Sequence, residues 1–367
     1  MKIGLIASPW VPVPPPRYGG TEAVVDVLAR GLQHAGDEVL LFTTGDSTCP
    51  VPRRWIYERA LGTAAITVAA EARQVVHAYE ALADCDVIHD HTLFGPLYAK
   101  AMTDVPVITT SHGPFTEELR DVYGSLADRV AVVAISQHQR SLAPEVEIAA
   151  VIYHGMDVEN VPFGRGDGGY AVFLGRMSAD KGAHRAVRVA RAAGVPLVLA
   201  AKMSEPEEHR YFHEKVEPLL GDDAVYIGEV GGRAKQELLG NAVALLNPIR
   251  WPEPFGLVMI EALASGTPVL AFRQGSAPEI IDHGVTGFLC NDEAEMARAL
   301  SRVGDLRRPD CRSAAALRFS TERMVADHRR LYRALASGRL QANVIDLAVP
   351  RGRRAAEFDV LSVIVAE

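Results

Sequence analysis

Ala-Val-Phe-Leu-Gly-Arg-Met-Ser-Ala-Asp-Lys-Gly, residues 171–182, joins a short apolar run to a polar turn that contains glycine. An apolar run of this length, uninterrupted by polar residues, is typical of a strand that is buried on both faces. A helix-like segment follows the turn, and the order of strand, turn and helix repeats on either side. Strands that alternate with helices in this way indicate parallel sheets of the doubly wound α/β class.

Further apolar runs predict two successive sets of strands. Between the first two strands, residues 21–35 carry apolar side chains on one helical face, and Gly36 marks the end of that helix. The strands are expected at 3–7, 39–43, 87–89, 105–110, 130–135 and 149–153 in the first set, and at 171–174, 197–200, 225–227, 243–246 and 269–272 in the second.

The chain of 367 residues is too long for one ordinary core, so two domains are expected. Residues 158–169 are rich in glycine and polar residues, which suits a linker. The first domain is therefore expected at 1–160 and the second at 161–320. A terminal helix is predicted at 321–336 and is expected to pack back on the first domain. The role of residues 337–367 stays open between an added strand, a partner-binding segment and a disordered end.

Charge and composition narrow the range of partners. The formal net charge is -8, and residues 1–155 hold 11 Lys and Arg against 18 Asp and Glu. An acidic half attracts neither nucleic acid nor anionic lipid, so we expect no nucleic-acid binding and no strong membrane association. The N-terminal apolar run is too short for a signal peptide, and the four cysteines lack metal-binding spacing. We therefore expect free thiols in a cytoplasmic protein, while the oligomeric state stays open.

Glycines and polar residues gather where strands are expected to end, which is where open α/β sheets bind ligands. In the first domain, Arg17, Tyr18, Gly19 and Gly20 lie between a strand and a helix. Paired glycines let the backbone approach a ligand closely, and the free N–H groups at the helix start suit a phosphate. The alternative is that the tight turn needs glycine for steric reasons alone.

In the second domain, Arg176 and Lys181 lie five residues apart between a strand and a helix. Two fixed cations would neutralise the two phosphates of a departing nucleoside diphosphate, since Arg supplies a fork of donors and Lys a point charge. The alternative is that both are solvated surface cations.

Two carboxylates, Glu253 and Glu261, flank a loop that becomes a helix at residues 255–257. A carboxylate that accepts two hydroxyl groups is the usual means of holding a ribose, and Glu261 would lie about one to two turns into the helix. Glu253, on the loop, suits the hydroxyls of a sugar. Two glutamates alone would favour surface charges, but the embedded Pro-Phe-Gly and the apolar residues 262–269 argue against that alternative.

Taken together, these motifs resemble glycosyltransferase family 4, the retaining enzymes whose two facing Rossmann-like domains form the GT-B fold with a cleft between them. The resemblance runs from about residue 1 to about residue 335, and several separated motifs in the family's order make it specific. The motifs are Gly19-Gly20-Thr21-Glu22, Ser111-His112-Gly113, His154-Gly155-Met156-Asp157, Gly175-Arg176 with Lys181-Gly182, Glu253 with Glu261, Gly275-Ser276-Ala277-Pro278-Glu279 and Gly284-Val285-Thr286-Gly287-Phe288-Leu289.

The resemblance implies a hexosyltransferase-type enzyme that moves a sugar from a nucleoside-diphosphate sugar, with UDP favoured over GDP, to a hydroxyl of a glycan or small-molecule acceptor. The implied mechanism is same-face attack with retention, which depends on positioning and charge stabilisation. No cofactor and no metal are expected, because Arg176 and Lys181 stand where a metal would be needed. Two rival functions remain, a nucleotide-sugar epimerase and a non-catalytic nucleotide-sugar-binding module.

The resemblance also implies roles for individual residues. Arg176 and Lys181 would stabilise the leaving diphosphate, Glu253 would hold the donor sugar, and His112 would position that sugar. His89 and His91 would lie on the acceptor side, or would instead be satisfied hydrogen-bonding residues at a strand end. Further donor contacts are implied for Gly19, Gly20, Gly228, Glu229, Val230, Phe255, Gly256, Leu257 and Glu261, and further acceptor-side contacts for Arg17 and Tyr18.

Overall fold

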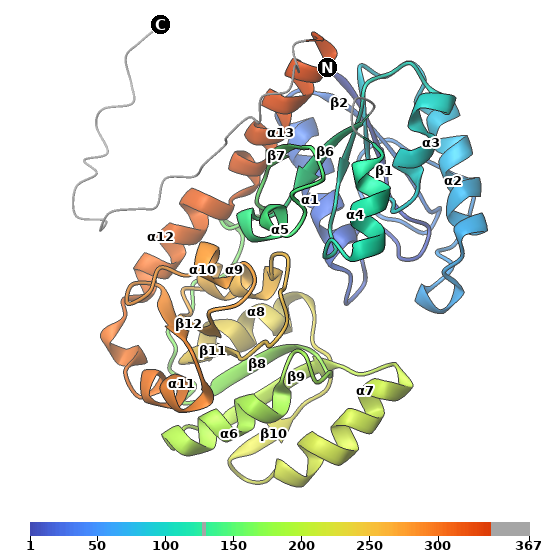
Figure 1. Ribbon diagram of the computed structural model, residues 1–367. Coiled ribbons are helices and arrows are strands. Elements are labelled where there is room, and N and C mark those ends of the chain that lie inside the picture. Colours follow the sequence, from blue (N-terminus) through green and yellow to red (C-terminus); the bar gives the residue numbers. More distant parts are fainter. Residues whose placement is uncertain (127–129, 339–367) are drawn as a thin grey trace, which may run out of the picture.

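A computed structural model describes residues 1–126 and 130–338 of the chain. Figure 1 shows two domains, the first coloured blue to green and the second yellow-green to orange, with helix α13 (Thr321–Ala336) running along the first domain. Of the expected tail at 337–367, all but the first two residues lie outside the described part of the chain.

The first domain is built on a seven-stranded sheet in which every neighbouring pair is parallel. The strand order is β3-β2-β1-β4-β5-β6-β7, so successive strands are added outward from β1 on one side and from β4 on the other. The strands are β1 (Lys2–Ile6), β2 (Glu38–Thr43), β3 (Arg53–Trp55), β4 (Val87–Asp90), β5 (Val107–Thr110), β6 (Val130–Ala134) and β7 (Ile148–Val151), and the α-helices are α1 (Gly20–His34), α2 (Val68–Ala81), α3 (Gly95–Met102), α4 (Glu117–Gly124) and α5 (Gln137–Ser141).

The second domain repeats this plan with a six-stranded parallel sheet in the order β10-β9-β8-β11-β12-β13. Two parallel sheets covered by helices confirm the expected α/β class. The strands are β8 (Ala171–Arg176), β9 (Leu197–Lys202), β10 (Ala224–Tyr226), β11 (Ala244–Asn247), β12 (Val269–Phe272) and β13 (Gly287–Cys290), and the α-helices are α6 (Ala183–Ala193), α7 (Pro206–Tyr211), α8 (Gly232–Asn241), α9 (Leu257–Ala264), α10 (Ala277–Ile280), α11 (Glu293–Leu300) and α12 (Arg308–Phe319).

Two strands were not predicted, and β8 and β9 each extend two residues beyond their predicted ranges. β8 does not end at Leu174 but continues to Arg176, because the backbone of Gly175 and Arg176 pairs with β9. β3 was not predicted, since its residues Arg-Arg-Trp form no apolar run and it lies at the sheet edge. β13 was also missed, because only its last three residues are large enough to signal burial.

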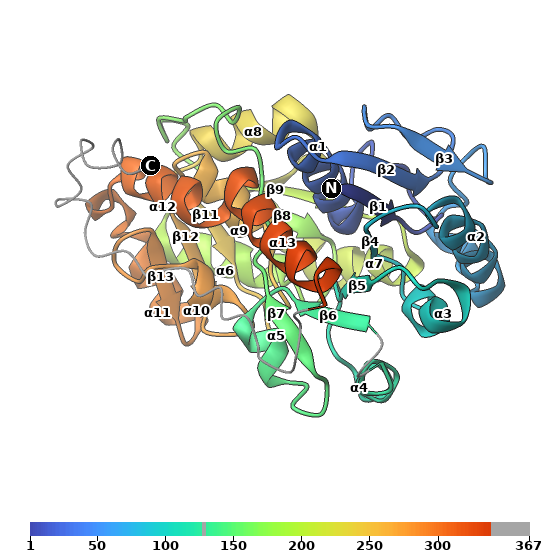
Figure 2. The ribbon, with the colours of Figure 1, turned by 90° about the horizontal axis from the view of Figure 1, so that it is seen from above.

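Helix α13 completes the core of the first domain although it follows the second domain in sequence. Its residues Met324 and Tyr332 are buried in the same cluster as the β1 side chains. Figure 2 shows α13 beside α1 and β4, in agreement with its contacts. A Cβ on Gly31 of α1 would lie 2.5 Å from a methyl carbon of Val325, so this glycine permits the close approach of the two helices.

The segment predicted as a linker is packed against the second domain. Val158 and Val161 are buried in a core cluster of that domain. The Gly164 N–H donates to the Ser265 carbonyl at 3.0 Å, and a Cβ on Gly164 would overlap the backbone of Gly240. The glycines here therefore serve close backbone packing, which composition alone does not distinguish from flexibility.

Candidate active site

The predicted donor residues lie at the carboxyl ends of the central strands of the second sheet. β8 and β11 are neighbours, and the strand order reverses between them. Arg176 is the last residue of β8, Lys181 follows in the turn before α6, and Glu253 lies in the loop after β11. Such reversal points are where open α/β sheets bind ligands. The topology therefore gathers residues that are far apart in the sequence.

Lys181 and Glu253 form a close ion pair, and their side chains are only 12% and 16% exposed. The Lys181 ammonium also lies 5.3 Å from the centre of the Trp251 ring. The second carboxylate oxygen of Glu253, Oε2, is buried and has no hydrogen-bond partner within the described residues. A diphosphate that contacts Lys181 and a sugar hydroxyl that contacts Glu253 would each replace part of this pair.

Arg176 is held more loosely, by two carboxylates. Its guanidinium lies 3.6 Å from Asp180 and 3.8 Å from Glu208, and its side chain is 41% exposed. Lys202, paired with Arg176 in the register of β8 and β9, lies 3.7 Å from the same Glu208 carboxylate. The Lys202 ammonium also faces the Tyr18 ring at 5.7 Å. Arg176 and Lys202 thus share one buried carboxylate, that of Glu208.

Glu208 was not identified from the sequence. Its carboxylate accepts the Ser204 and Glu205 backbone N–H groups at the start of α7, which is the pattern of a capping box. That signal is readable in the sequence and predicts a helix cap. The second role of Glu208, as a partner of Arg176 and Lys202, depends on the register of β8 and β9. It could not be predicted from the sequence around Glu208.

Glu261 lies at the fifth residue of α9, one turn into the helix as expected. Its carboxylate pairs with the Lys235 ammonium of α8 at 2.6 Å, and both side chains are partly exposed. Lys235 was also missed, because the contact joins two helices. The pair places a further cation next to the carboxylate expected to hold a ribose.

Gly275 and Ser276 hold the loop that carries Glu253. Gly275 has a φ of +58°, and a Cβ there would lie 2.5 Å from the Glu253 carbonyl oxygen. The Ser276 N–H donates to that carbonyl at 3.1 Å, and the Ser276 hydroxyl donates to the Phe255 carbonyl. Phe255 itself is buried, so its ring anchors the loop. Gly256, at φ +96°, then caps α9, which begins at Leu257.

The glycine turn of the first domain approaches the second domain. A Cβ on Gly20 would lie 3.4 Å from the side chain of Leu257, at the start of α9. Nearby, the Tyr18 N–H donates to the Glu229 carboxylate at 3.1 Å, and Arg17 lies 3.9 Å from the same group. Arg17 and Tyr18, expected on the acceptor side, thus contact a residue expected on the donor side.

The stretch expected to hold the nucleotide base lies just beyond β10. Gly228 has a φ of +81°, with nothing within 4 Å of a Cβ placed there. Glu229 and Val230 are partly exposed. Gly19, at the N-terminus of α1, is packed instead, since its Cβ would lie 2.6 Å from Pro15.

Four histidines gather at the strand ends of the first domain, and His328 of α13 lies beside them. His91 Nδ1 lies 2.9 Å from His112 Nε2, and the His112 ring stacks on His154 with centroids 5.2 Å apart. Burial lowers the pKa of His112 to about 3 and that of His328 to about 4, and it lowers the pKa of His89, His91 and His154 as well. These rings are therefore neutral at physiological pH.

His89 does not support an acceptor-side role. The residue is fully buried, and both ring nitrogens have partners, the Tyr332 hydroxyl at 2.7 Å and the Thr110 hydroxyl at 2.8 Å. The structure favours the alternative of a satisfied hydrogen-bonding residue, since no nitrogen is left for a substrate. His112 differs, because it is only partly buried and, within the described residues, only its Nε2 has a hydrogen-bond partner.

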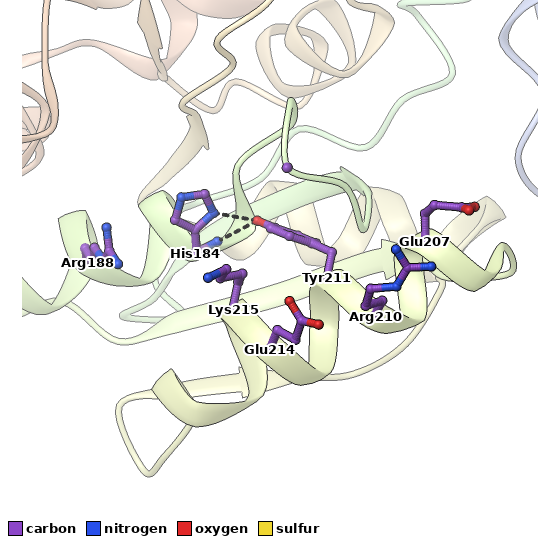
Figure 3. Close-up of a pocket in the computed structure, with 8 residues that line it drawn as sticks. His184, Arg188, Glu207, Arg210, Tyr211, Glu214 and Lys215 are labelled. Carbon is purple, nitrogen blue, oxygen red and sulfur yellow. Dashed lines mark hydrogen bonds between the residues drawn. The ribbon is translucent and has the colours of Figure 1, made fainter.

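A pocket of about 450 Å³ lies between α6 and α7, and its lining includes none of the residues predicted for the site. Figure 3 shows the Tyr211 hydroxyl bonded to the ring and backbone nitrogens of His184. Burial and nearby cations lower the pKa of His184 to about 4. The lining residues are Ala179, His184, Arg188, Glu207, Arg210, Tyr211, Glu214 and Lys215.

Within residues 1–126 and 130–338, no helix combines the length and the apolar character needed to cross a bilayer.

Two family models match the chain, one for each domain. The model described as Glycosyltransferase Family 4 matches residues 18–160, and the model described as Glycosyl transferases group 1 matches residues 161–315.

Named relatives match over most of their length. Alpha-maltose-1-phosphate synthase of Mycobacterium tuberculosis is 27% identical over 350 residues, covering 81% of this chain and 86% of the relative. AviGT4, a glycosyltransferase involved in avilamycin A biosynthesis, is 26% identical with a TM-score of 0.67, covering 92% of this chain and 98% of its own. Anabaena HepE, solved with UDP and glucose, has a TM-score of 0.73 at 20% identity, covering 91% and 100% of the two chains.

Proposed function

Because the chain belongs to glycosyltransferase family 4 and is a glycosyltransferase of the GT-B fold, we propose that it transfers a sugar from a nucleoside-diphosphate sugar with retention of configuration. The donor is UDP-linked in preference to GDP-linked, and the acceptor is a hydroxyl of a glycan or small molecule. The observation that carries this proposal is the convergence of Arg176, Lys181 and Glu253 at the β8–β11 reversal.

The charges at this reversal suit a nucleoside diphosphate. Arg176 and Lys181 would contact the diphosphate, Lys202 of β9 shares the Glu208 carboxylate with Arg176, and Lys235 of α8 pairs with Glu261. Phosphate oxygens accept stronger hydrogen bonds from such cations than from neutral donors. Glu253 and Glu261, each already paired with a lysine, would exchange part of that contact for sugar and ribose hydroxyls.

The reaction breaks the bond between the anomeric carbon and the phosphate oxygen and forms a bond from that carbon to the acceptor oxygen. The acceptor proton passes to the departing phosphate oxygen on the same face of the sugar. Arg176 and Lys181 stabilise the negative charge that develops on the diphosphate, which is the electrostatic contribution that usually dominates. Glu253 and His112 hold the sugar in the reacting orientation.

We further propose that the reaction needs neither a metal nor a cofactor, because Arg176 and Lys181 would neutralise the diphosphate in place of a metal. Turnover is expected to be unchanged in a chelator. Restoration of lost turnover by Mg²⁺ or Mn²⁺ would contradict the proposal.

The buried free thiols at Cys49, Cys85, Cys290 and Cys311 support a reducing, cytoplasmic location.

Calorimetric titration with UDP, GDP, ADP and TDP tests the donor class. UDP is proposed because a structural neighbour, HepE, was solved in complex with UDP and glucose. We expect UDP to bind more tightly than GDP, and transfer or slow hydrolysis of the matching sugar nucleotide to yield the retained anomer. Binding of none of the four nucleotides would contradict the proposed function, and an inverted product would contradict the mechanism alone.

Replacing Glu261 by alanine is expected to weaken UDP binding about tenfold or more, because a charged acceptor of ribose hydroxyls is lost. Inorganic pyrophosphate, which lacks the ribose, should bind the variant almost as it binds the native protein. Glu237→Ala is the matched control, since Glu237 is an exposed carboxylate on α8 that pairs with Arg233 of its own helix. Unchanged UDP affinity in Glu261→Ala would remove the ribose assignment.

A further inference from the structure

His91 and His112 come from adjacent strands of the first sheet. His91 follows β4 and His112 lies just beyond β5, and these strands are parallel neighbours. Their carboxyl ends therefore meet at one edge, where His91 Nδ1 and His112 Nε2 lie 2.9 Å apart. A hydrogen bond between two ring nitrogens requires that one carries a proton and the other does not.

Two arrangements of protons satisfy this bond when both rings are neutral. In the first, His91 Nδ1–H donates to a bare His112 Nε2, so the single proton of His112 lies on its Nδ1. In the second, His112 Nε2–H donates to a bare His91 Nδ1, so the proton of His91 lies on its Nε2 and His112 Nδ1 is bare. The two arrangements thus give His112 opposite hydrogen-bonding characters at Nδ1, a donor in the first and an acceptor in the second.

The other nitrogen of His91 distinguishes them. His91 Nε2 is buried and has no hydrogen-bond partner within the described residues. The second arrangement would bury an N–H with no acceptor, while the first leaves only a bare ring nitrogen there. Buried N–H groups without partners are rarer than buried acceptors without partners, so the first arrangement is favoured.

The rings around His91 hold it in place. The His89 ring lies 3.9 Å from the His91 ring, centre to centre, and both nitrogens of His89 are already bonded. One of those bonds reaches Tyr332 of α13, and His328 of the same helix lies 5.3 Å from His89. The return of α13 to the first domain therefore fixes the plane in which His91 meets His112.

We propose that His91 is a positioning residue that donates through Nδ1–H to His112 Nε2 and so fixes the proton of His112 on Nδ1. The inference rests on the proposed function, in which His112 faces the donor sugar. His112 then offers that sugar a hydrogen-bond donor, which suits a hydroxyl oxygen, and it offers no basic nitrogen that could remove the acceptor proton. Its role is to hold the sugar in place.

Two variants of nearly equal shape test the role of His91. His91→Asn keeps an amide N–H that can donate to His112, whereas His91→Asp keeps only acceptor atoms and forces the proton of His112 onto Nε2. We expect kcat/KM to stay within about threefold of native in His91→Asn and to fall about ten- to hundredfold in His91→Asp, as for the loss of one good hydrogen bond. Equal losses in the two variants, each folded by thermal melting, would overturn the inference.

Long-range ¹H–¹⁵N spectra of the full chain show directly which nitrogen of His112 carries the proton. We expect Nδ1 in the native protein and in His91→Asn, and Nε2 in His91→Asp. A proton on Nε2 in the native protein overturns the inference but leaves glycosyl transfer standing. Conversely, an Nδ1 proton in a protein that binds no nucleotide supports the His91 assignment and contradicts the proposed function. The native spectrum decides the assignment even if His91→Asp does not fold.

Discussion

Lys181→Ala is expected to lower kcat about 10²- to 10³-fold while it weakens binding of the sugar nucleotide much less. The reason is that the Lys181 charge matters most when the bond to the diphosphate breaks and negative charge develops there. In the ground state, Arg176 and its neighbour Lys202 still attract the diphosphate. Single-turnover kinetics together with calorimetric titration of the sugar nucleotide separate the two effects.

The control for this variant must account for the partner of Lys181. Removing the ammonium leaves the Glu253 carboxylate without its ion pair, so thermal melting should accompany the kinetics. Lys2→Ala provides a matched control, because Lys2 forms an ion pair with Asp84 on the surface of the first domain, away from the site. Losses of equal size in turnover and in binding would contradict a leaving-group role for Lys181.

Gly275→Ala is expected to lower the melting temperature by several degrees and to weaken sugar-nucleotide binding more than tenfold. A non-glycine residue at φ +58° is strained by about 1–3 kcal/mol, and the new Cβ would lie 2.5 Å from the Glu253 carbonyl oxygen. The loop that carries Glu253 must move to relieve this contact, which takes the carboxylate out of position. Differential scanning calorimetry and titration of UDP-glucose measure the two effects.

Gly284→Ala separates backbone strain from the clash. Gly284 has a similar φ of +79°, but nothing lies within 4 Å of a Cβ at that position. This variant should show only the strain, with sugar-nucleotide affinity close to native. If both glycine variants lost stability and affinity equally, the contact between Gly275 and the Glu253 loop would have no special role.

Local patterns of apolar residues in the sequence predicted much of the fold. Continuous apolar runs predicted eleven of the strands, because a strand that is buried on both faces consists mostly of apolar residues. β3 and β13 were missed, β3 because it is a charged edge strand. β8 was predicted but is two residues longer than its apolar run, because pairing with β9 extends it. Strand pairing depends on two segments, so it cannot be read from the sequence of either segment alone.

The residues of the proposed donor site, Arg176, Lys181, Glu253 and Glu261, could be singled out from the sequence, since they lie in short motifs with their own spacing. Their partners could not. Glu208 beside Arg176, Lys235 beside Glu261, and Gly275 against Glu253 join segments that are 22 or more residues apart. Strand register and helix packing alone bring these atoms together.

The histidines show most clearly which features follow from the local sequence and which depend on the tertiary structure. The amino-acid sequence is enough to place His89, His91 and His112 at strand ends, because strand positions follow from the local apolar pattern. It does not distinguish a buried His89, with both ring nitrogens bonded, from a partly buried His112 that has only its Nε2 bonded within the described residues. That difference arises when β4 and β5 lie side by side and α13 brings Tyr332 and His328 against them. Hydrogen bonds between side chains depend on distances of a few tenths of an ångström, which only the folded chain establishes.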